Sequence, residues 1–325
     1  MIAVIPAAGE GTRLRPHTHT LPKVLVDVAG KPILGHILDQ LVAAGISRVV
    51  LIVGYLGDLV EEYVRGHFRL EAFFVEQEER KGLGHAVSLA RPHVEDKPCL
   101  IIYGDTIFEV DLPSMLVGEV NLIGVKAVED PRRFGVVETD GRRITRLVEK
   151  PEAPKSNLAI VGLNKLVDSA AMFDAIDHLM KHEIRTQGEY QLTDAFQRMI
   201  EVGARLETFP VEDWFDCGKQ ETLLSTNRRL LERAAAASER PGTVIVPPVY
   251  IADEAEVEES VIGPYVSIAA GCRVRRAVLS DCILSVGAVV ENMVLKNSLI
   301  GARARVAGSA LVYDGGDSST VSHIE

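Results

Sequence analysis

The chain has 325 residues, of which 47% are hydrophobic and 25% are charged, and its formal net charge is −11. This composition is that of a globular protein with room for two ordinary domains, or for one large and one small domain. The acidic balance excludes a general nucleic-acid or membrane-surface binder, because such proteins carry a basic excess. An anionic substrate must therefore be held by a local group of cations and backbone amides.

The four cysteines show no CxxC or CxxH spacing; they are Cys99, Cys217, Cys272 and Cys282. This pattern predicts reduced thiols rather than a zinc site or a disulfide framework. The first apolar run, Ile2–Ile5, is too short for a signal peptide or a membrane span, and we expect a cytoplasmic protein.

The first third of the chain alternates buried strand patterns with helical periodicity. Strands are expected at Met1–Pro6, Arg48–Val53, Phe73–Val75 and Leu100–Tyr103, and helices at Ile33–Ala44, Gly57–Val64 and His85–Ala90. Repeated strand–helix–strand units with apolar strands predict an α/β domain whose sheet is covered on both faces.

Beyond Asp111 the pattern is less regular. Strands are expected at Val120–Val128, Gly135–Glu138, Ile144–Val148 and Ile160–Val167, and helices at Asp168–His182, Leu192–Val202 and Lys219–Ala237. Asp140-Gly141 is typical of a hairpin turn between two of these strands. A Rossmann-like mixed sheet therefore fits residues 1–240 better than a symmetric two-half dinucleotide fold.

After Thr243 the helical periodicity ends and apolar residues recur every six positions. The series are Ile262, Ile268 and Val274; Leu284 and Val290; and Ile300 and Val306. Six-residue repeats indicate a parallel β-helix, here of three to four coils at roughly eighteen residues per coil. We favour this fold over a β-sandwich with accidental spacing. We assign it to residues 241–313, and residues 314–325 to a polar, loose tail.

A glycine-rich segment directly follows the first strand: Ala7-Ala-Gly9-Glu-Gly11-Thr-Arg13-Leu-Arg15-Pro16. Glycines let backbone amides approach phosphate oxygens, and the two arginines add positive charge. The segment fits neither the GxGxxG nor the GxxxxGK[ST] fingerprint. Taken alone, it is compatible with a phosphate loop or with a tight connection.

Together with Pro22-Lys23 and Gly30-Lys-Pro-Ile-Leu34, this segment resembles the signature of the nucleoside-diphosphate-sugar pyrophosphorylases, or sugar nucleotidyltransferases. The resemblance implies a nucleotidyltransferase domain followed by a left-handed parallel β-helix. It also implies transfer of a nucleotidyl group to a hexose 1-phosphate, with release of pyrophosphate. The residues implied for the nucleotide are Ala8, Gly9, Gly11, Thr12, Arg13, Gln77, Gly82, Tyr103 and Gly104, and the implied catalytic cations are Arg13, Lys23 and Lys150.

The segment from Gln77 to Ala86 resembles the nucleobase loop of this family, in particular that of pyrimidine-using members. The Gln77 amide offers both a donor and an acceptor to a uracil or thymine edge, and Gly82 permits close backbone approach. For His85 we favour packing at a helix N-terminus over catalysis.

Two aspartates are candidate Mg²⁺ ligands. Asp105 follows the apolar run Ile101-Ile-Tyr-Gly, and Asp216 lies in Trp214-Phe-Asp-Cys-Gly218. Taken singly, each aspartate fits a helix or turn cap equally well. The resemblance implies that both bind Mg²⁺, whose preferred ligands are hard oxygens.

The resemblance also implies that Glu149 bonds sugar hydroxyls and Lys150 holds the sugar phosphate. The element Gly188-Glu189-Tyr-Gln-Leu-Thr-Asp194 suggests a sugar contact by Glu189 and a helix cap at Thr193-Asp194. Before it, Gln187 stands where many thymidylyltransferases have arginine. The full set implied for the sugar phosphate is Gly135, Glu149, Lys150, Val161, Gly162, Glu189 and Trp214.

Several alternatives stay open at this point. The nucleotide is dTTP or UTP, and glucose 1-phosphate is the favoured sugar. A non-catalytic regulatory subunit and an acyltransferase in the β-helix are rival functions. No histidine lies between Thr243 and Asp314 to act as an acyltransferase base, so we expect a structural β-helix that assembles homo-oligomers. The expected partners are small-molecule substrates, with no nucleic acid and no membrane.

Overall fold

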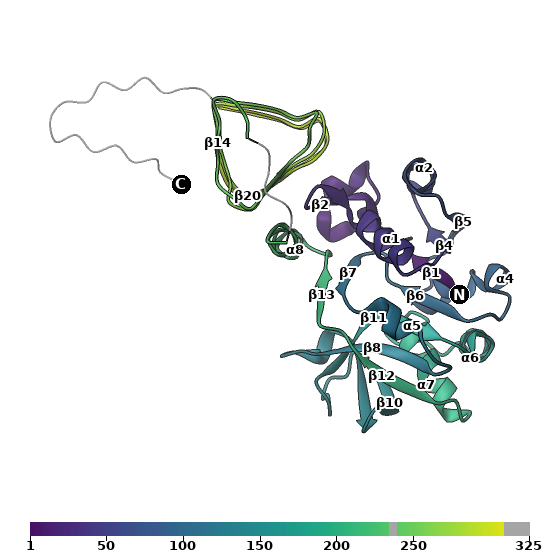
Figure 1. Cartoon of the computed structure of the whole chain (residues 1–325). Coiled ribbons are helices and arrows are strands. Elements are labelled where there is room, and N and C mark those ends of the chain that lie inside the picture. The colour runs from purple at the N-terminus through teal and green to yellow at the C-terminus, as the bar shows by residue number, and fades with distance from the viewer. Residues whose placement is uncertain (234–238, 309–325) are drawn as a thin grey trace. The chain divides into compact units, whose positions relative to one another are not determined.

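In a computed structural model of the chain, the structure describes residues 1–233 and 239–308. They belong to two compact units, Met1–Thr226 and a second unit that begins at Asn227 (Figure 1). This division lies before the domain boundary that we expect at residue 240, and that boundary stays a prediction. The Asn227 side chain donates to the Tyr265 carbonyl (3.1 Å) and accepts from the Ser267 hydroxyl (2.6 Å), so it belongs to the second unit. The expected tail at 314–325 lies outside the described residues.

The first unit is built on a nine-stranded mixed sheet with the order β5-β4-β1-β6-β11-β8-β12-β10-β9. The bounds are β1 (Ile2–Pro6), β4 (Arg48–Val53), β5 (Glu71–Glu76), β6 (Cys99–Ile102), β8 (Asn121–Ala127), β9 (Gly135–Asp140), β10 (Arg143–Glu149), β11 (Leu158–Leu166) and β12 (Leu206–Pro210). β5, β4, β1 and β6 run parallel, whereas β11 is antiparallel to β6 and β8. The predicted mixed sheet is therefore confirmed.

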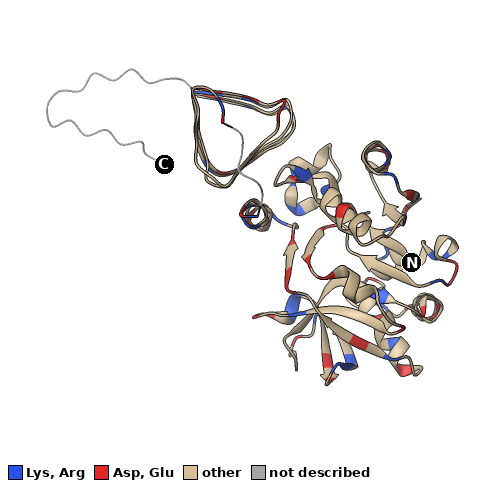
Figure 2. Ribbon diagram, in the orientation of Figure 1, with Lys and Arg blue, Asp and Glu red and all other residues tan. Residues whose placement is uncertain are grey.

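The helices of this unit pack on the sheet through apolar faces. Their bounds are α1 (Ile33–Ala43), α2 (Gly57–His67), α3 (Leu83–Ser88), α4 (Arg91–Val94), α5 (Leu112–Leu116), α6 (Ser169–Lys181) and α7 (Leu192–Glu201), and α8 (Gln220–Leu231) follows. One core joins Ile101 and Ile123 of the sheet to Phe173 of α6 and Phe196 of α7, all fully buried. In Figure 2 the central strands carry almost no charge, as their sequences predict for strands covered on both faces.

Two details of the helices differ from our expectations. α7 has Gln191 at its N-cap, so the prediction that Thr193-Asp194 cap it is wrong. α8 ends at Leu231 rather than Ala237, and residues 234–238 lie outside the described part. The Asp168 side chain caps α6, where it accepts from the Ala171 amide at 3.0 Å.

Short elements that the sequence did not predict complete the unit. β7 (Thr106–Glu109) and β13 (Asp213–Asp216) form an antiparallel pair, with Thr106 opposite Asp216. β2 (Asp27–Val28) pairs with β3 (Lys31–Pro32). Four 3₁₀ turns are also present: η1 (Thr12–Leu14), η2 (His17–His19), η3 (Lys23–Leu25) and η4 (Pro131–Arg133). The β7–β13 pair brings together two segments about a hundred residues apart in the sequence.

The second unit contains the predicted parallel β-helix, whose coils project as a triangle in Figure 1. Its strands are β14 (Val244–Ile245), β15 (Val249–Ile251), β16 (Glu256–Glu258), β17 (Val261–Ile262), β18 (Val266–Ile268), β19 (Arg273–Arg275), β20 (Val278–Leu284), β21 (Val289–Glu291), β22 (Val294–Ile300) and β23 (Arg305–Ala307). Val244, Val261, Val278 and Val294 pair in succession, so a coil takes seventeen or sixteen residues rather than eighteen.

The chain turns at the corners of the triangle through residues with positive φ. Gly271, Gly287 and Arg303 mark one corner. Tyr265, Asp281 and Asn297 mark another, and Glu259, Arg276 and Asn292 the third. Three left-handed residues per coil bend the chain between short flat strands.

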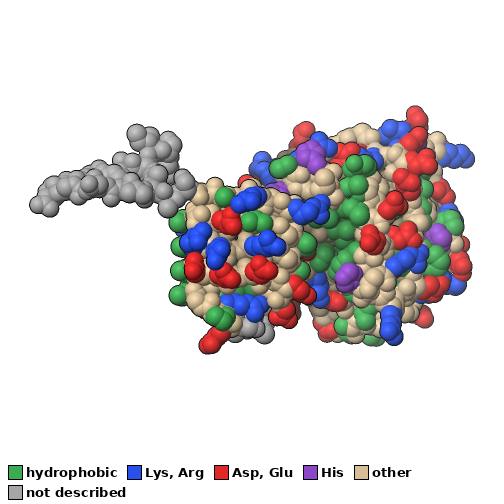
Figure 3. Space-filling view, turned by 90° about the horizontal axis from the view of Figure 1, so that it is seen from above, with side chains coloured by type: hydrophobic (Ala, Val, Ile, Leu, Met, Phe, Trp, Pro, Cys, Tyr) green, Lys and Arg blue, Asp and Glu red, His purple; other side chains and the backbone are tan. Residues whose placement is uncertain are grey.

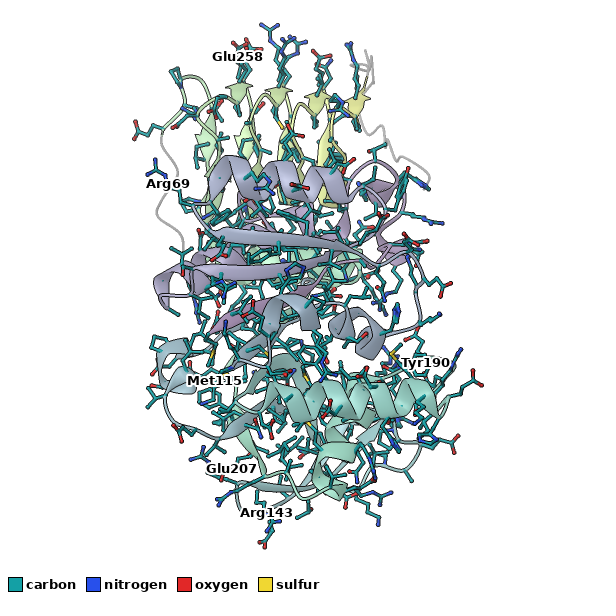
Figure 4. The ribbon with its side chains drawn as sticks, turned by 90° about the vertical axis from the view of Figure 1, so that its right-hand side faces the viewer. Arg69, Met115, Arg143, Tyr190, Glu207 and Glu258 are labelled. Atoms are coloured by element: carbon teal, nitrogen blue, oxygen red, sulfur yellow. The ribbon has the colours of Figure 1, made fainter. Side chains whose placement is uncertain are left out.

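Two outer faces of the β-helix differ in chemistry. On one face glutamates and arginines of neighbouring coils form ion pairs, and Figure 4 shows Glu258 there pointing outward. Another face carries the row Val244, Val261, Val278 and Val294, in which Val278 and Val294 are 43% and 76% exposed. Figure 3 shows a column of hydrophobic side chains at the edge of this unit. We call these four residues the valine row.

Candidate active site

The loop after β1 is folded tightly against the segment that carries Lys23. A Cβ on Gly11, whose φ is +63°, would lie 2.9 Å from both Thr18 Cγ2 and Lys23 Cβ. The Thr18 hydroxyl also donates to the Gly11 carbonyl at 2.8 Å. Only glycine allows this conformation and this close approach, and as a result Lys23 is held beside the loop.

The loop from Gln77 to Gly82 and the following helix fix one end of the Gln77 side chain. Gln77, which follows β5 and is 7% exposed, donates from Nε2 to the Gly82 carbonyl at 3.3 Å and contacts His85 Nδ1 at 3.1 Å. Burial, together with the charge on Lys81, lowers the pKa of His85, so the ring is neutral and can accept this bond at neutral pH. The arrangement agrees with a packing role for His85. These two contacts orient the Gln77 amide through its nitrogen and do not involve its carbonyl oxygen.

The two candidate metal ligands come together through the β7–β13 pair. Asp105 precedes Thr106, and Asp216 lies opposite Thr106 on the adjacent strand. The Cys217 amide also donates to the Asp105 carbonyl at 3.1 Å. Antiparallel pairing thus places both carboxylates at the same end of a two-stranded ribbon.

Lys23 forms an ion pair with Asp105. Its ammonium, on an 8% exposed side chain, lies 2.6 Å from Asp105 Oδ2. Desolvation alone would raise the pKa of Asp105, but Lys23 and the Thr106 hydroxyl outweigh it and lower that pKa. Asp105 is therefore ionised at neutral pH, as an electrostatic or metal-binding role requires.

These segments enclose a cavity of about 430 Å³. Most of the residues predicted for the nucleotide line it: Ala8, Gly9, Gly11, Thr12, Arg13, Gln77, Gly82 and Tyr103. Lys23, Asp105 and Glu189 line it too. Gly104 does not; its amide donates to the Pro6 carbonyl at 3.1 Å, beside β1.

The residues predicted for the sugar phosphate divide among several places. The partly buried Glu149 accepts a hydrogen bond from the Thr193 hydroxyl (2.7 Å), and its carboxylate lies 3.4 Å from the Lys150 ammonium. A Cβ on Gly162 would lie 2.3 Å from the Tyr103 ring, so glycine is required for that ring to pack there. Burial raises the pKa of Tyr103, and the charges of Glu149 and Asp105 raise it further. Both carboxylates therefore lie near this ring.

The remaining members of that set lie elsewhere. Val161 is 2% exposed, so its side chain is in the core. A Cβ on Gly135 would lie 2.7 Å from the Thr193 hydroxyl and 3.1 Å from Glu149 Oε2. Trp214 lines a second cavity of about 460 Å³ together with Arg13 and Asp216. Lys150 lines a third cavity of about 510 Å³.

Sequence reasoning missed several residues around these cavities. Arg80 lines the first cavity and pairs with Glu10, which also lies 3.0 Å from Arg15. A Cβ on Gly218 would meet Asp216 Oδ1 at 2.7 Å and Arg13 Nη2 at 2.8 Å, so the glycine lets these groups lie together. Gly218 belongs to the element Trp214-Phe-Asp-Cys-Gly218, so the sequence could have identified it. Arg80 carried no motif signal.

With this geometry established, comparison with known proteins decides the family. The model of the family described as nucleotidyl transferase matches residues 2–233. The chain belongs to this family.

Relatives within the nucleotidyl transferase family support the assignment. The glucose-1-phosphate thymidylyltransferase of Streptomyces antibioticus is 32% identical over 95% of this chain and 94% of its own length. The low-salt glycan biosynthesis nucleotidyltransferase Agl11 of Haloferax volcanii is 37% identical over 71% of this chain. The bifunctional protein GlmU of Methanocaldococcus jannaschii is 38% identical over 72%. The matches span 66% of Agl11 and 55% of GlmU.

A solved nucleotidyltransferase structure has the same fold. A UDP-glucose pyrophosphorylase complexed with UDP-glucose aligns with a TM-score of 0.63 at 23% identity, over 72% of this chain and 99% of that chain. Among the described residues, no helix is both long and apolar enough to cross a membrane.

Proposed function

We propose that this protein joins a nucleoside triphosphate, dTTP or UTP, to a hexose 1-phosphate and releases pyrophosphate. The observation that carries this proposal is the nucleotide cavity, where the phosphate loop, Lys23, Asp105 and Gln77 converge. Nearly full-length similarity to a glucose-1-phosphate thymidylyltransferase favours glucose 1-phosphate as the acceptor. A uridylyltransferase relative, AglF of Haloferax volcanii, is 34% identical over 74% of this chain, which keeps UTP beside dTTP.

The proposed reaction is an in-line displacement at the α-phosphorus. An oxygen of the sugar phosphate forms the new bond, and the bond from the α-phosphorus to the bridging oxygen of pyrophosphate breaks. A general base is not needed, because a phosphate monoester with a second pKa of about 6 is largely dianionic at neutral pH. Positioning and charge neutralisation are the protein's main contributions to this kind of transfer.

The chain's own residues divide this work. Arg13 and the backbone of the phosphate loop hold the triphosphate, while Lys23 is directed to it by the close packing against Gly11. Lys150 holds the sugar phosphate, and Glu149, fixed by Thr193, accepts bonds from sugar hydroxyls. Gln77, fixed by Gly82 and His85, offers its carbonyl oxygen to the base.

The donor set fits a Mg²⁺ ion shared with the substrate. Asp105 and Asp216 are hard oxygen ligands on paired strands, and no group of three metal-ligating side chains exists among the described residues. A two-carboxylate site suits Mg²⁺, which keeps water and phosphate oxygens in its shell. When bound, the ion would neutralise charge on the phosphates.

The test is a pyrophosphate-release assay with dTTP, UTP, ATP and GTP against glucose, galactose, mannose and N-acetylglucosamine 1-phosphates. We expect turnover with a pyrimidine nucleotide and glucose 1-phosphate, and little with purines, because a site that hydrogen-bonds one edge rejects another. Efficient use of ATP or GTP would contradict the base assignment. No turnover with any pair, while nucleotide binding persists, would instead favour the regulatory-subunit alternative.

We further propose that the β-helix assembles copies of this chain through the valine row and has no acyltransferase activity. The valine row is an uncharged strip on a protein of net charge −11, so two copies can meet there without opposing carboxylates. An isologous contact between two such flat rows is self-complementary. Light scattering of Val278→Lys/Val294→Lys should show a smaller mass than the unaltered protein, and an unchanged mass would contradict this interface.

A further inference from the structure

A short hairpin lies between α6 and α7. Thr186 and Glu189 form an antiparallel bridge, in which the Thr186 amide donates to the Glu189 carbonyl at 3.0 Å and the Glu189 amide donates back at 3.2 Å. Between them, Gln187 has a φ of +54° and Gly188 a φ of +83°. Two successive left-handed residues are typical of the tight turn in a two-residue hairpin. We call residues 186–189 the hairpin.

Two backbone hydrogen bonds join Tyr190, the residue after the hairpin, to the base loop (residues 77–82) and to the start of α3. The Tyr190 amide donates to the Lys81 carbonyl, and the Gly84 amide donates to the Tyr190 carbonyl, both at 2.8 Å. A Cβ on Gly82, whose φ is +109°, would lie 2.7 Å from the Tyr190 carbonyl oxygen. Because only glycine permits so close a contact, the base loop is packed directly on the end of the hairpin.

Side chains fix the hairpin to the core of the first unit. Tyr190 is 4% exposed, and Arg185 lies over its ring, 4.6 Å from the centroid, and donates to its hydroxyl at 3.1 Å. Gln191, which is 6% exposed at the N-cap of α7, donates from Nε2 to the Glu189 carboxylate at 3.2 Å and to the Thr186 carbonyl at 3.4 Å. A buried amide without these acceptors would be unsatisfied, which is unfavourable. The hairpin is therefore held from both ends.

The hairpin reaches the proposed nucleotide position through the base loop. Glu189 lines the nucleotide cavity together with Gln77 and Gly82. The Gln77 amide is bound to the Gly82 carbonyl, and Gly82 packs on Tyr190, so continuous contacts run from the hairpin to the amide that we propose reads the base. A hydrogen bond to a ligand weakens when its donor or acceptor shifts, so a base-reading amide needs a support of this kind.

We propose that the hairpin, held by Gln191 and Arg185, positions the base loop for the nucleotide, so that nucleotide affinity depends on the hairpin even when no sugar phosphate is bound. The proposal rests on the proposed function, because it takes the nucleotide to occupy this cavity. Gln191 and Arg185 are positioning residues, since they act through the hairpin. When the hairpin leaves its place, fewer molecules have a base loop ready for the nucleotide, and the apparent affinity falls by the same fraction.

The test measures binding of dTTP and of UTP to the full chain by calorimetry, without sugar phosphate. No atom lies within 4 Å of a Cβ built on Gly188, so Gly188→Ala strains the left-handed turn without a clash. It should weaken nucleotide binding about three- to tenfold, and Gly188→Asn should recover part of the loss because asparagine tolerates this conformation. Gly141→Ala is the matched control: Gly141 has a φ of +59° and the same open space, but it lies in the turn between β9 and β10, and its replacement should leave nucleotide binding unchanged.

Amide hydrogen exchange of the ligand-free protein shows whether the base loop itself has loosened. Gly188→Ala should speed exchange at the amides of Gly84 and Tyr190, while the amides of β1 stay protected, because a local opening exposes only the bonds it breaks. Arg185→Gln, which loosens Tyr190 from outside the turn, should change exchange and nucleotide binding in the same direction and by a smaller factor. kcat at saturating substrates should stay within about twofold in both variants, since neither residue touches a reacting atom.

Three results would overturn the proposal. One is unchanged nucleotide binding in Gly188→Ala despite faster exchange at Gly84. Another is an equal loss of nucleotide binding in Gly141→Ala. The third is an effect confined to the KM for glucose 1-phosphate, which would assign the hairpin to the sugar alone.

Failure of the proposed function gives a different result. Calorimetry needs no turnover, so a chain that binds nucleotide without reaction tests the hairpin equally well. If the unaltered chain binds neither dTTP nor UTP, the proposed function fails and the nucleotide part of this proposal fails with it. Faster exchange at Gly84 and Tyr190 in Gly188→Ala would then still establish the hairpin as the support of residues 77–82.

Discussion

The two units of this chain place their cations in different surroundings. On the β-helix, four arginines lie between 2.9 and 3.8 Å from glutamates of neighbouring coils; they are Arg273, Arg275, Arg276 and Arg305. Around the cavities of the first unit, Arg13, Arg133 and Lys219 have no such partner among the described residues. A chain of net charge −11 has enough carboxylates to neutralise its cations. The ion pairs of the β-helix therefore link its coils, whereas Lys23 and Lys150 of the first unit pair with Asp105 and Glu149 beside the cavities.

The largest expected effect tests the proposed role of the cavities of the first unit. Asp216→Asn should fold normally and lose at least about a hundredfold in kcat, because removing one group that stabilises transition-state charge typically costs about 10²–10³. The measurement is pyrophosphate release across a Mg²⁺ titration. A near-native rate at limiting Mg²⁺ would show that Asp216 is not a metal ligand.

Asp213→Asn is the matched control, because it makes the same change three residues earlier on β13. Asp213 pairs with Lys126 rather than lining the cavity with Asp216. The control should keep its kcat within about threefold, since an ion pair of this partly exposed kind contributes little. Equal losses in both variants would indicate damage to β13 rather than to a metal site.

A smaller effect should distinguish the binding position of the sugar phosphate from that of the nucleotide. Lys150→Ala removes the cation expected on the sugar phosphate, so it should raise the KM for glucose 1-phosphate about tenfold and leave the KM for the nucleotide within twofold. Tenfold corresponds to about 1.4 kcal/mol, the scale of one charged hydrogen bond. Arg13→Ala should show the reverse preference. The opposite pattern in the two variants would show that the subsites are exchanged.

The partly buried carboxylate of Asp27 allows the cost of a charge to be measured through the stability of the fold. Desolvation raises the pKa of Asp27 from 3.8 to about 6. Because the folded-state pKa is the higher one, its contribution to stability is complete below about pH 4 and is lost as the pH rises through 6. Asp27→Asn should therefore be more stable than the unaltered chain by about 1–3 kcal/mol at pH 8, and equally stable below pH 4.

Thermal or urea unfolding at both pH values measures this difference. A variant that is less stable at pH 8 would mean that the charged form of Asp27 is stabilised by its surroundings.

His85 tests whether the base loop is held as the contacts indicate. His85→Ala removes the acceptor at 3.1 Å from the Gln77 amide, so the KM for the nucleotide should rise about three- to tenfold. kcat should change less than twofold, since the ring touches no reacting atom. The exposed His182→Ala serves as the control. A large fall in kcat, with a new slope in the pH profile, would instead make His85 an acid–base catalyst.

Local patterns predicted most of the fold, because strand and helix periodicities depend on residues that are close together in the sequence. The central strands, α6 and the β-helix repeat were found in this way. The pairing of β7 with β13 was not, since four-residue strands about a hundred positions apart carry no local signal. That pairing joins Asp105 to Asp216, which the sequence could associate only through a family resemblance.

The site was predictable to the same degree and for the same reason. Glycine-rich loops have a local sequence pattern, and Gly9, Gly11 and Gly82, which that pattern singled out, line the first cavity. Arg80, which lines the first cavity, was missed because an arginine outside any motif looks like any surface cation in the sequence.

The smallest expected effect tests the structural side of the contrast. Arg275 lies 3.2 Å from Glu258 of the preceding coil, and both side chains are more than half exposed. Such a pair is screened by water and salt, so Arg275→Gln should change the free energy of unfolding by less than about 0.5 kcal/mol and leave turnover unchanged. Chemical unfolding at low and high salt measures this. A loss above 1 kcal/mol that disappears in high salt would mean that the row of ion pairs acts as a network, and that pairing on the β-helix stabilises its coils more than isolated surface pairs do.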